Sequence, residues 1–105
     1  MNNNKSFHPI LYVDDEEDNL TVFHSAFRRD YDVHLALSGQ EGLEIMKKHD
    51  IHLIITDQRM PEMTGIQFLE KIIPDYPDCI RMILTGFSDI EAIIQAIKIG
   101  RASCR

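Results

Sequence analysis

The stretch LIITDQRMPEMTG, Leu53 to Gly65, decides the fold of this 105-residue chain. It opens with a short apolar run, Leu53 to Thr56, which is typical of a strand that is buried on both faces. The run ends in a single carboxylate, Asp57, and Pro61 and Gly65 then supply turn residues. A buried strand that carries one aspartate to its tip predicts a functional group at the end of a sheet.

Three further strands are predicted around this one. The four predicted strands are Ile10–Val13, Tyr31–Ala36, Leu53–Thr56 and Arg81–Thr85. A segment of helical periodicity follows each of them, so that strands and helices alternate along the chain. Such alternation with short loops predicts a parallel sheet with helices on both faces. In sheets of this kind, ligands bind beyond the carboxyl ends of the strands.

Apolar spacing and capping residues define the four helices. The residues expected to face the core are Leu20, Phe23 and Phe27 in the first helix, Leu43 and Met46 in the second, Ile66, Leu69 and Ile73 in the third, and Ile90, Ile93, Ile94 and Ile97 in the fourth. Capping boxes at Ser38–Glu41 and Ser88–Glu91 mark the starts of the second and fourth helices. The third helix is expected to end near Pro74.

Composition and charge limit the classes of function. The net charge is −6 and the isoelectric point is about 5.2, so binding to the polyanionic backbone of nucleic acid is disfavoured. No apolar run approaches the ~20 residues needed to cross a bilayer. The two cysteines, Cys79 and Cys104, are expected to be free thiols. We therefore expect a single cytoplasmic domain with no direct contact to nucleic acid or membrane.

Polar side chains gather at the predicted carboxyl ends of three strands. The first strand ends at Asp14 and Asp15, the third at Asp57, and the fourth at Thr85 and Gly86. If the first and third strands are neighbours, the three carboxylates converge, and a hard cation such as Mg²⁺ would neutralise them. A carboxylate beside Mg²⁺ can attack phosphorus. Asp57 lies centrally and is the predicted nucleophile, with the Thr85 hydroxyl and the Gly86 backbone N–H as donors to a phosphoryl group.

Some of these residues also fit simpler interpretations. An Asp-Asp pair often does no more than cap a helix. A calcium-binding loop starting at Asp14 is excluded, because Asn19 and Ser25 occupy the positions of its glycine and its bidentate glutamate. A zinc site at His49 and His52 is not expected, because no cysteine partners them. Cys79 is expected to be a small core residue.

Three motifs, ILYVDDEEDN, LIITDQRMPEMTG and MILTGFSD, together resemble the receiver domain of bacterial two-component response regulators. The resemblance runs from about Ile10 to Gly100. It implies a flavodoxin-like, doubly wound parallel sheet with strand order 2-1-3-4-5. It also implies a role in phosphorelay signal transduction, in which Asp57 accepts a phosphoryl group from a phosphohistidine on a sensor histidine kinase or a phosphotransfer protein.

The resemblance assigns roles to individual residues. Asp15 would bind Mg²⁺ directly together with Asp57, Asp14 would act mainly through water, and the backbone carbonyl of Arg59 would complete the protein ligands. Thr85 matches the hydroxyl that turns toward the phosphoryl group when the domain switches. The chemistry would be directed at the protein itself, so no turnover of a metabolite, and hence no enzyme in the usual sense, is expected.

The C-terminal end departs from the family pattern. Residues 1–7 are expected to be disordered, residues 8–100 to form the receiver, and residues 101–105 to form a tail in place of a fifth strand with its lysine and a fifth helix. The fourth strand, Arg81–Thr85, would then be an uncovered edge, which predicts either self-association through that strand and the fourth helix or a marked loss of stability.

Two alternative functions come from other classes. A pseudo-receiver that serves as a non-switching interaction or dimerisation module stays open. An aspartate-nucleophile phosphohydrolase of the haloacid dehalogenase type is set aside, because that family needs a second aspartate where Arg59 stands.

Overall fold

The computed structural model describes residues 8–84 and residue 94. The elements are β1 (His8–Val13), α1 (Glu17–Phe27), β2 (Tyr31–Ala36), α2 (Gly39–Lys48), β3 (Leu53–Asp57), α3 (Gly65–Ile72) and β4 (Ile80–Leu84). Predictions for residues 1–7, for Thr85, Gly86 and most of the fourth helix, and for the 101–105 tail lie outside the described residues.

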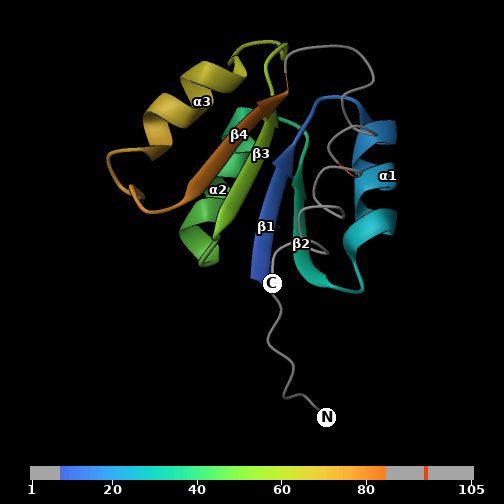
Figure 1. The fold of residues 1–105 in the computed structure, drawn as a ribbon. Helices are drawn as coiled ribbons and strands as arrows, with labels where there is room; N and C mark the ends of the chain where they lie inside the picture. Colours follow the sequence, from blue (N-terminus) through green and yellow to red (C-terminus); the bar gives the residue numbers. More distant parts are fainter. Residues whose placement is uncertain (1–7, 85–93, 95–105) are drawn as a thin grey trace.

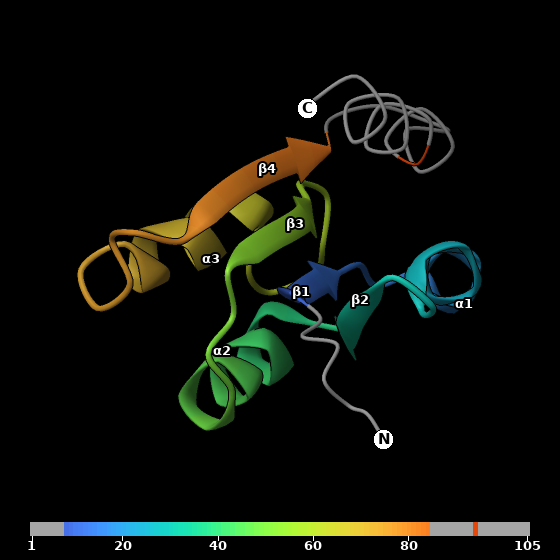
Figure 2. The same ribbon diagram turned by 60° about the horizontal axis from the view of Figure 1, so that its bottom comes forward.

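The described strands form one parallel sheet in the order β2-β1-β3-β4, which confirms the predicted doubly wound arrangement. All four strands point the same way in Figure 1. Helices α2 and α3 cover one face of the sheet and α1 covers the other, as Figure 2 shows. Since connections of this kind place all carboxyl ends at one edge, the last residues of β1, β3 and β4 share that edge.

Strand β1 begins at His8, two residues before the predicted start at Ile10. The reason lies in its pairing, because His8 and Pro9 pair with β2 before β1 first meets β3 at Ile10. A sequence pattern of burial on both faces detects only the part of the strand that has neighbours on both sides. Strand β2 has the predicted limits, and β3 includes Asp57 as its last residue.

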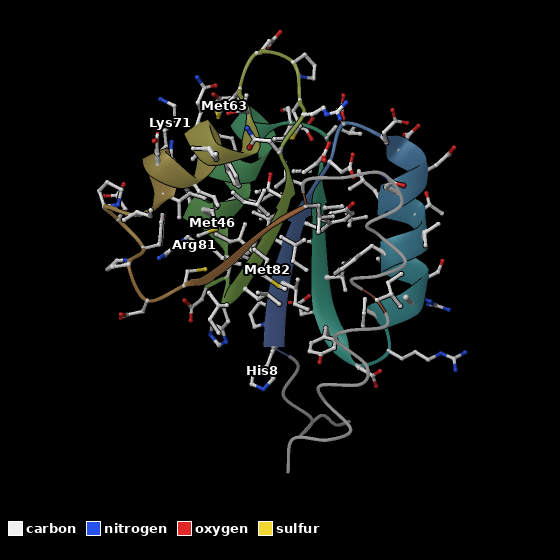
Figure 3. The ribbon with its side chains drawn as sticks, turned by 45° about the horizontal axis from the view of Figure 1, so that its top comes forward. His8, Met46, Met63, Lys71, Arg81 and Met82 are labelled. Atoms are coloured by element: carbon white, nitrogen blue, oxygen red, sulfur yellow. The ribbon has the colours of Figure 1, made fainter. Side chains whose placement is uncertain are left out.

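Alternate residues of the central strands supply two separate hydrophobic cores. On the α2 and α3 side, the buried residues include Leu11, Val13, Met46, Ile54, Phe68, Leu69 and Ile72. On the α1 side they include Ile10, Tyr12, Leu20, Phe23, Phe27, Ile55 and Leu84, with Ile94 packed against them. Figure 3 shows Met46 lying between α2 and the sheet. Both faces of β1 and β3 are therefore covered, as their continuous apolar sequences indicate.

Helix α3 packs on a different stripe from the predicted one. Ile66 and Ile73 are 49% and 43% exposed, whereas Phe68, Leu69 and Ile72 are buried. Leu69 is buried as predicted, but Phe68 and Ile72 are buried in place of Ile66 and Ile73, so the prediction was wrong for two of its three residues. The apolar residues of this segment form one wide stripe, and the sequence does not fix which part of the stripe faces the core, which packing decides.

Side-chain caps begin both helices on this face. At α2, the Glu41 backbone N–H donates to the Ser38 hydroxyl as predicted, but the Glu41 carboxylate accepts from the Leu37 N–H at 2.8 Å and not from Ser38. At α3, Thr64 and Gln67 form a full capping box that the sequence analysis missed. This second cap fixes where the loop that follows Asp57 ends.

The end of the sheet away from the carboxyl ends of the strands is formed by the turns before β3 and β4. His8 lies at this end and Met63 at the opposite one in Figure 3.

Cys79 is 8% exposed and donates its thiol proton to the Ile51 carbonyl at 3.3 Å, so its prediction as a small core residue is confirmed. Burial raises the pKa of this thiol, the positive charge of Arg81 lowers it in part, and the negative charge of Asp50 raises it further.

In the part of the chain that the structure describes, no helix is long and apolar enough to cross a membrane.

Candidate functional site

Neighbouring strands bring the predicted acidic residues together. Strands β1 and β3 are paired in register, with Val13 opposite Thr56. Asp14 follows Val13, and Asp57 follows Thr56, so both side chains leave the sheet at the same edge. Asp57 is in turn paired with Leu84 of β4, the last described residue before the predicted Thr85 and Gly86. The two residues themselves lie outside the described part of the chain, and their roles stay predictions.

The three carboxylates form one compact cluster. One oxygen each from Asp14, Asp15 and Asp57 lies within 4.8 Å of the others. Asp14 is 2% exposed, Asp57 is partly buried, and Asp15 is exposed. The expected convergence of the three side chains is therefore present, with one carboxylate in the interior and one open to solvent.

Asp14 is held by three hydrogen-bond donors. Its Oδ1 accepts from the Glu16 backbone N–H at 2.9 Å, and its Oδ2 accepts from the Asn19 side-chain amide at 3.0 Å and from the Tyr12 hydroxyl. The N-cap of α1 is Glu16, which makes no side-chain cap. Asp14 is thus not the helix cap that the simpler interpretation proposed. Sequence analysis did not single out Tyr12 or Asn19 as part of this site.

The loop after Asp57 is fixed by Gln58, which sequence analysis also missed. The Gln58 side-chain carbonyl accepts from the Ile66 N–H at 2.9 Å, and its backbone carbonyl accepts from the Gly65 N–H at 3.1 Å. A Cβ atom at Gly65 would lie 2.5 Å from the Asp57 carbonyl oxygen, so only glycine permits this approach. Glu62 adopts a φ of 71°, a left-handed conformation that is rare outside glycine. The loop returns tightly to the strand end and immobilises the backbone on which Asp57 sits.

The environment of Asp57 favours its protonated form. Burial is the largest cause of its raised pKa, and the negative charges of Asp14 and Asp15 add to it. The nearby backbone at Gln58 and Arg59 lowers this pKa in part. The use of the Arg59 backbone carbonyl as a metal ligand stays a prediction.

The cluster fits a hard divalent cation. Three carboxylates that repel one another, one of them with a raised pKa, are neutralised well by an ion that prefers oxygen ligands and keeps part of its water, as Mg²⁺ does. In the described residues no other group of histidine, cysteine and acidic side chains could hold a metal. His52 instead lies 3.4 Å from Asp50, and His49 lies against the ring of His34.

The sequence as a whole matches the model of one protein family, described as the response regulator receiver domain, over residues 10–104. The chain belongs to this family. It is 36% identical to the transcriptional regulatory protein ZraR of Escherichia coli over 87% of its own length and 21% of the relative's. It is 33% identical to the hydrogenase transcriptional regulatory protein HoxA of Bradyrhizobium diazoefficiens over 84% of its length and 18% of the relative's. The chain thus spans about a fifth of these curated relatives.

Solved structures of receiver domains share the fold. A response regulator receiver domain protein from Clostridium thermocellum superposes with a TM-score of 0.72 at 34% identity, covering 90% of this chain and 77% of that one. A CheY-like receiver domain protein from Methanospirillum hungatei gives 0.74 at 27% identity, covering 90% and 77%. The resemblance stated from the three motifs is therefore confirmed, and so is the flavodoxin-like fold.

The raised pKa of Asp57 predicts how the stability of this receiver depends on pH. Because the folded-state pKa lies above its ordinary value of 3.8, the folded state binds more protons, and without divalent ions stability falls as pH rises from that value through the folded pKa. Asp57→Asn removes this loss. At neutral pH we expect the variant to be more stable by about 0.5–1 kcal/mol, a small figure because solvent screens the partly exposed carboxylate.

Urea unfolding in EDTA between pH 4 and pH 7 measures this difference. It should shrink toward the acidic end of the range, because the parent carboxylate is then increasingly protonated. Asp75→Asn, on the exposed turn before β4, is the matched control and should show no such trend. A difference that grows as the pH falls would contradict the prediction.

Proposed function

We propose that this receiver accepts a phosphoryl group on Asp57 from a phosphohistidine of a sensor histidine kinase or phosphotransfer protein. The observation that carries the proposal is the convergence of three carboxylates around the end of the central strand β3. A carboxylate that is fixed in position, partly buried and surrounded by metal-binding groups is suited to nucleophilic attack on phosphorus.

In the proposed step, a carboxylate oxygen of Asp57 attacks the phosphorus atom. The new O–P bond forms as the P–N bond to the donor breaks, and the electron pair of that bond goes to the imidazole nitrogen. The imidazole leaves as a neutral ring when its other nitrogen carries a proton. The product is an acyl phosphate on Asp57, and no metabolite is consumed, so the receiver acts as a signalling phosphoacceptor and not as an enzyme with turnover.

The chain's own residues provide the alignment for this step. Pairing of Asp57 with Leu84, the bond from the Gln58 N–H to the Leu84 carbonyl and the loop through Gln58 fix the backbone that carries the carboxylate. Asp15 and Asp57, with the Arg59 carbonyl, would hold Mg²⁺ directly, and Asp14 would act through water. When bound, this ion supplies positive charge that offsets the repulsion between the carboxylate and the phosphoryl oxygens.

The residues that follow β4 complete the proposed site. The Thr85 hydroxyl and the Gly86 backbone N–H would donate to phosphoryl oxygens, since they follow directly after the residue paired with Asp57. This assignment rests on their place in the sequence and on the family pattern.

Incubation with acetyl phosphate and Mg²⁺, followed by mass spectrometry of the intact protein, tests the proposal. We expect a gain of about 80 Da that requires Mg²⁺ and is lost on treatment with hydroxylamine, as an acyl phosphate should be. Peptide mapping should place the adduct in the segment that contains Asp57. If no adduct forms with acetyl phosphate or with phosphorylated kinase, the pseudo-receiver function, a non-switching interaction module, is the better account.

Self-association through Arg81–Thr85 and the fourth helix also stays a prediction. Of these residues, only Arg81–Leu84 and Ile94 lie in the described part of the chain, where β4 pairs with β3. Sedimentation velocity at micromolar concentration measures the expected dimer. A stable monomer would contradict the prediction without affecting the proposed chemistry.

A further inference from the structure

The four lone-pair positions of the Asp14 carboxylate are unequally used. Oδ2 accepts two hydrogen bonds, from the Tyr12 hydroxyl and from the Asn19 side-chain amide, and Oδ1 accepts one, from the Glu16 N–H. A carboxylate oxygen offers about two acceptor positions in the carboxylate plane. Oδ2 is therefore filled, and with respect to residues 8–84 and residue 94 only Oδ1 keeps a position for a metal ion or a water molecule.

The packing of Tyr12 fixes the donor at Oδ2. Tyr12 is fully buried in the α1-side core, with its ring 4.7 Å from that of Phe23. Its hydroxyl is thereby directed along the sheet toward the acidic cluster, two residues away in the sequence. Asn19, in the first turns of α1, approaches the same oxygen from the helix side. The two donors come from different elements, so Oδ2 is confined from two directions.

This confinement bears on which cation the cluster accepts. Ca²⁺ takes six to eight oxygen ligands and commonly uses both oxygens of a carboxylate, whereas Mg²⁺ takes six, keeps several waters and binds carboxylates through single oxygens. With Oδ2 filled, Asp14 cannot act as a bidentate ligand. Asp14 can still accept a hydrogen bond from a metal-bound water, or act as a monodentate ligand through Oδ1.

We propose that Tyr12 and Asn19 are specificity-determining positioning residues, which make the acidic cluster favour Mg²⁺ over Ca²⁺ by occupying Oδ2 of Asp14. The inference rests on the metal site of the proposed function and adds a reason for its selectivity. Removing the two donors frees Oδ2, allows bidentate ligation by Asp14, and so improves Ca²⁺ binding relative to Mg²⁺.

The test compares Mg²⁺ and Ca²⁺ dissociation constants for the unsubstituted receiver, Tyr12→Phe, Asn19→Ala and the double variant. Titrations followed by amide resonances near Asp15 and Asp57 give both constants without any phosphoryl donor. Tyr12→Phe keeps the buried ring and removes only the hydroxyl, and Asn19→Ala changes a side chain that is only partly buried. Tyr76→Phe, at the far end of the sheet, is the matched control.

We expect the ratio of Ca²⁺ to Mg²⁺ affinity to rise by about tenfold in the double variant, within the range typical of changes to residues that orient metal ligands. Each single variant should move in the same direction, and the control should not change. If Tyr12→Phe does not fold, Asn19→Ala decides alone.

Equal weakening of both ions would show a merely structural role and overturn the inference, as would an unchanged ratio. Failure of the unsubstituted receiver to bind either ion would overturn the metal assignment as well. Failure to phosphorylate with normal metal binding would count against the proposed function only.

Discussion

Asp57→Asn is expected to gain no mass under conditions in which the unsubstituted receiver gains about 80 Da. The substitution replaces a charged carboxylate oxygen by an amide of nearly the same size, which is a far weaker nucleophile and cannot form the acyl phosphate. The hydrogen bonds that fix the neighbouring loop involve Gln58, Gly65 and Ile66 and are left in place. Intact-protein mass spectrometry after incubation with acetyl phosphate and Mg²⁺ measures the result.

Two further variants show whether the loss is specific. Asp75→Asn, exposed on the turn before β4, should be phosphorylated like the parent. Asp15→Asn should slow the reaction without abolishing it, because it removes a proposed metal ligand and leaves the proposed nucleophile. An undiminished adduct on Asp57→Asn would mean that another side chain accepts the phosphoryl group.

Phe68→Ala is expected to have the largest effect on stability. The ring is fully buried in the core beneath α2 and α3, and it fills the space over Gly42, where an added Cβ would lie 2.8 Å from the ring. Deleting a buried phenylalanine side chain costs about 3–5 kcal/mol, through lost burial and the cavity left behind. Because small domains are stable by only about 5–15 kcal/mol, urea unfolding should show a large fall in the midpoint.

Ile66→Ala on the same helix is the natural comparison. Its side chain is 49% exposed, so the free energy of unfolding should change by less than about 0.5 kcal/mol, as for most surface substitutions. Equal losses at Phe68 and Ile66 would contradict the packing of α3 described above.

The sequence predicts this fold well because its central strands are apolar on both faces. Continuous apolar runs such as Ile10–Val13 and Leu53–Thr56 are buried on both faces, so their identification needs no knowledge of orientation. The alternation of strands and helices then orders the sheet, and the acidic residues follow from the shared carboxyl edge. That edge brought Asp14, Asp15 and Asp57 together as expected.

The sequence did not predict how helix α3 is rotated about its axis, or where the Tyr12 and Asn19 side chains point. The apolar residues of helix α3 form one wide stripe, and only contact with the sheet selects Phe68 and Ile72 over Ile66 and Ile73 at its edges. The bonds from Tyr12 and Asn19 to Asp14 depend on where a strand and a helix meet. One signal was available, since a tyrosine within a buried strand requires a partner for its hydroxyl.

The separation of the two ends of the sheet has a practical consequence for anyone who wishes to attach a reporter to this protein. The acidic side chains leave the carboxyl ends of β1 and β3, whereas the turn through Pro74, Asp75, Pro77 and Asp78 is exposed at the opposite end, before β4 begins. Exposed turns with small or polar side chains accept insertions and labels best. A fluorophore or affinity handle placed there would stand a full strand length from Asp57 and would leave the charges around that residue unaltered.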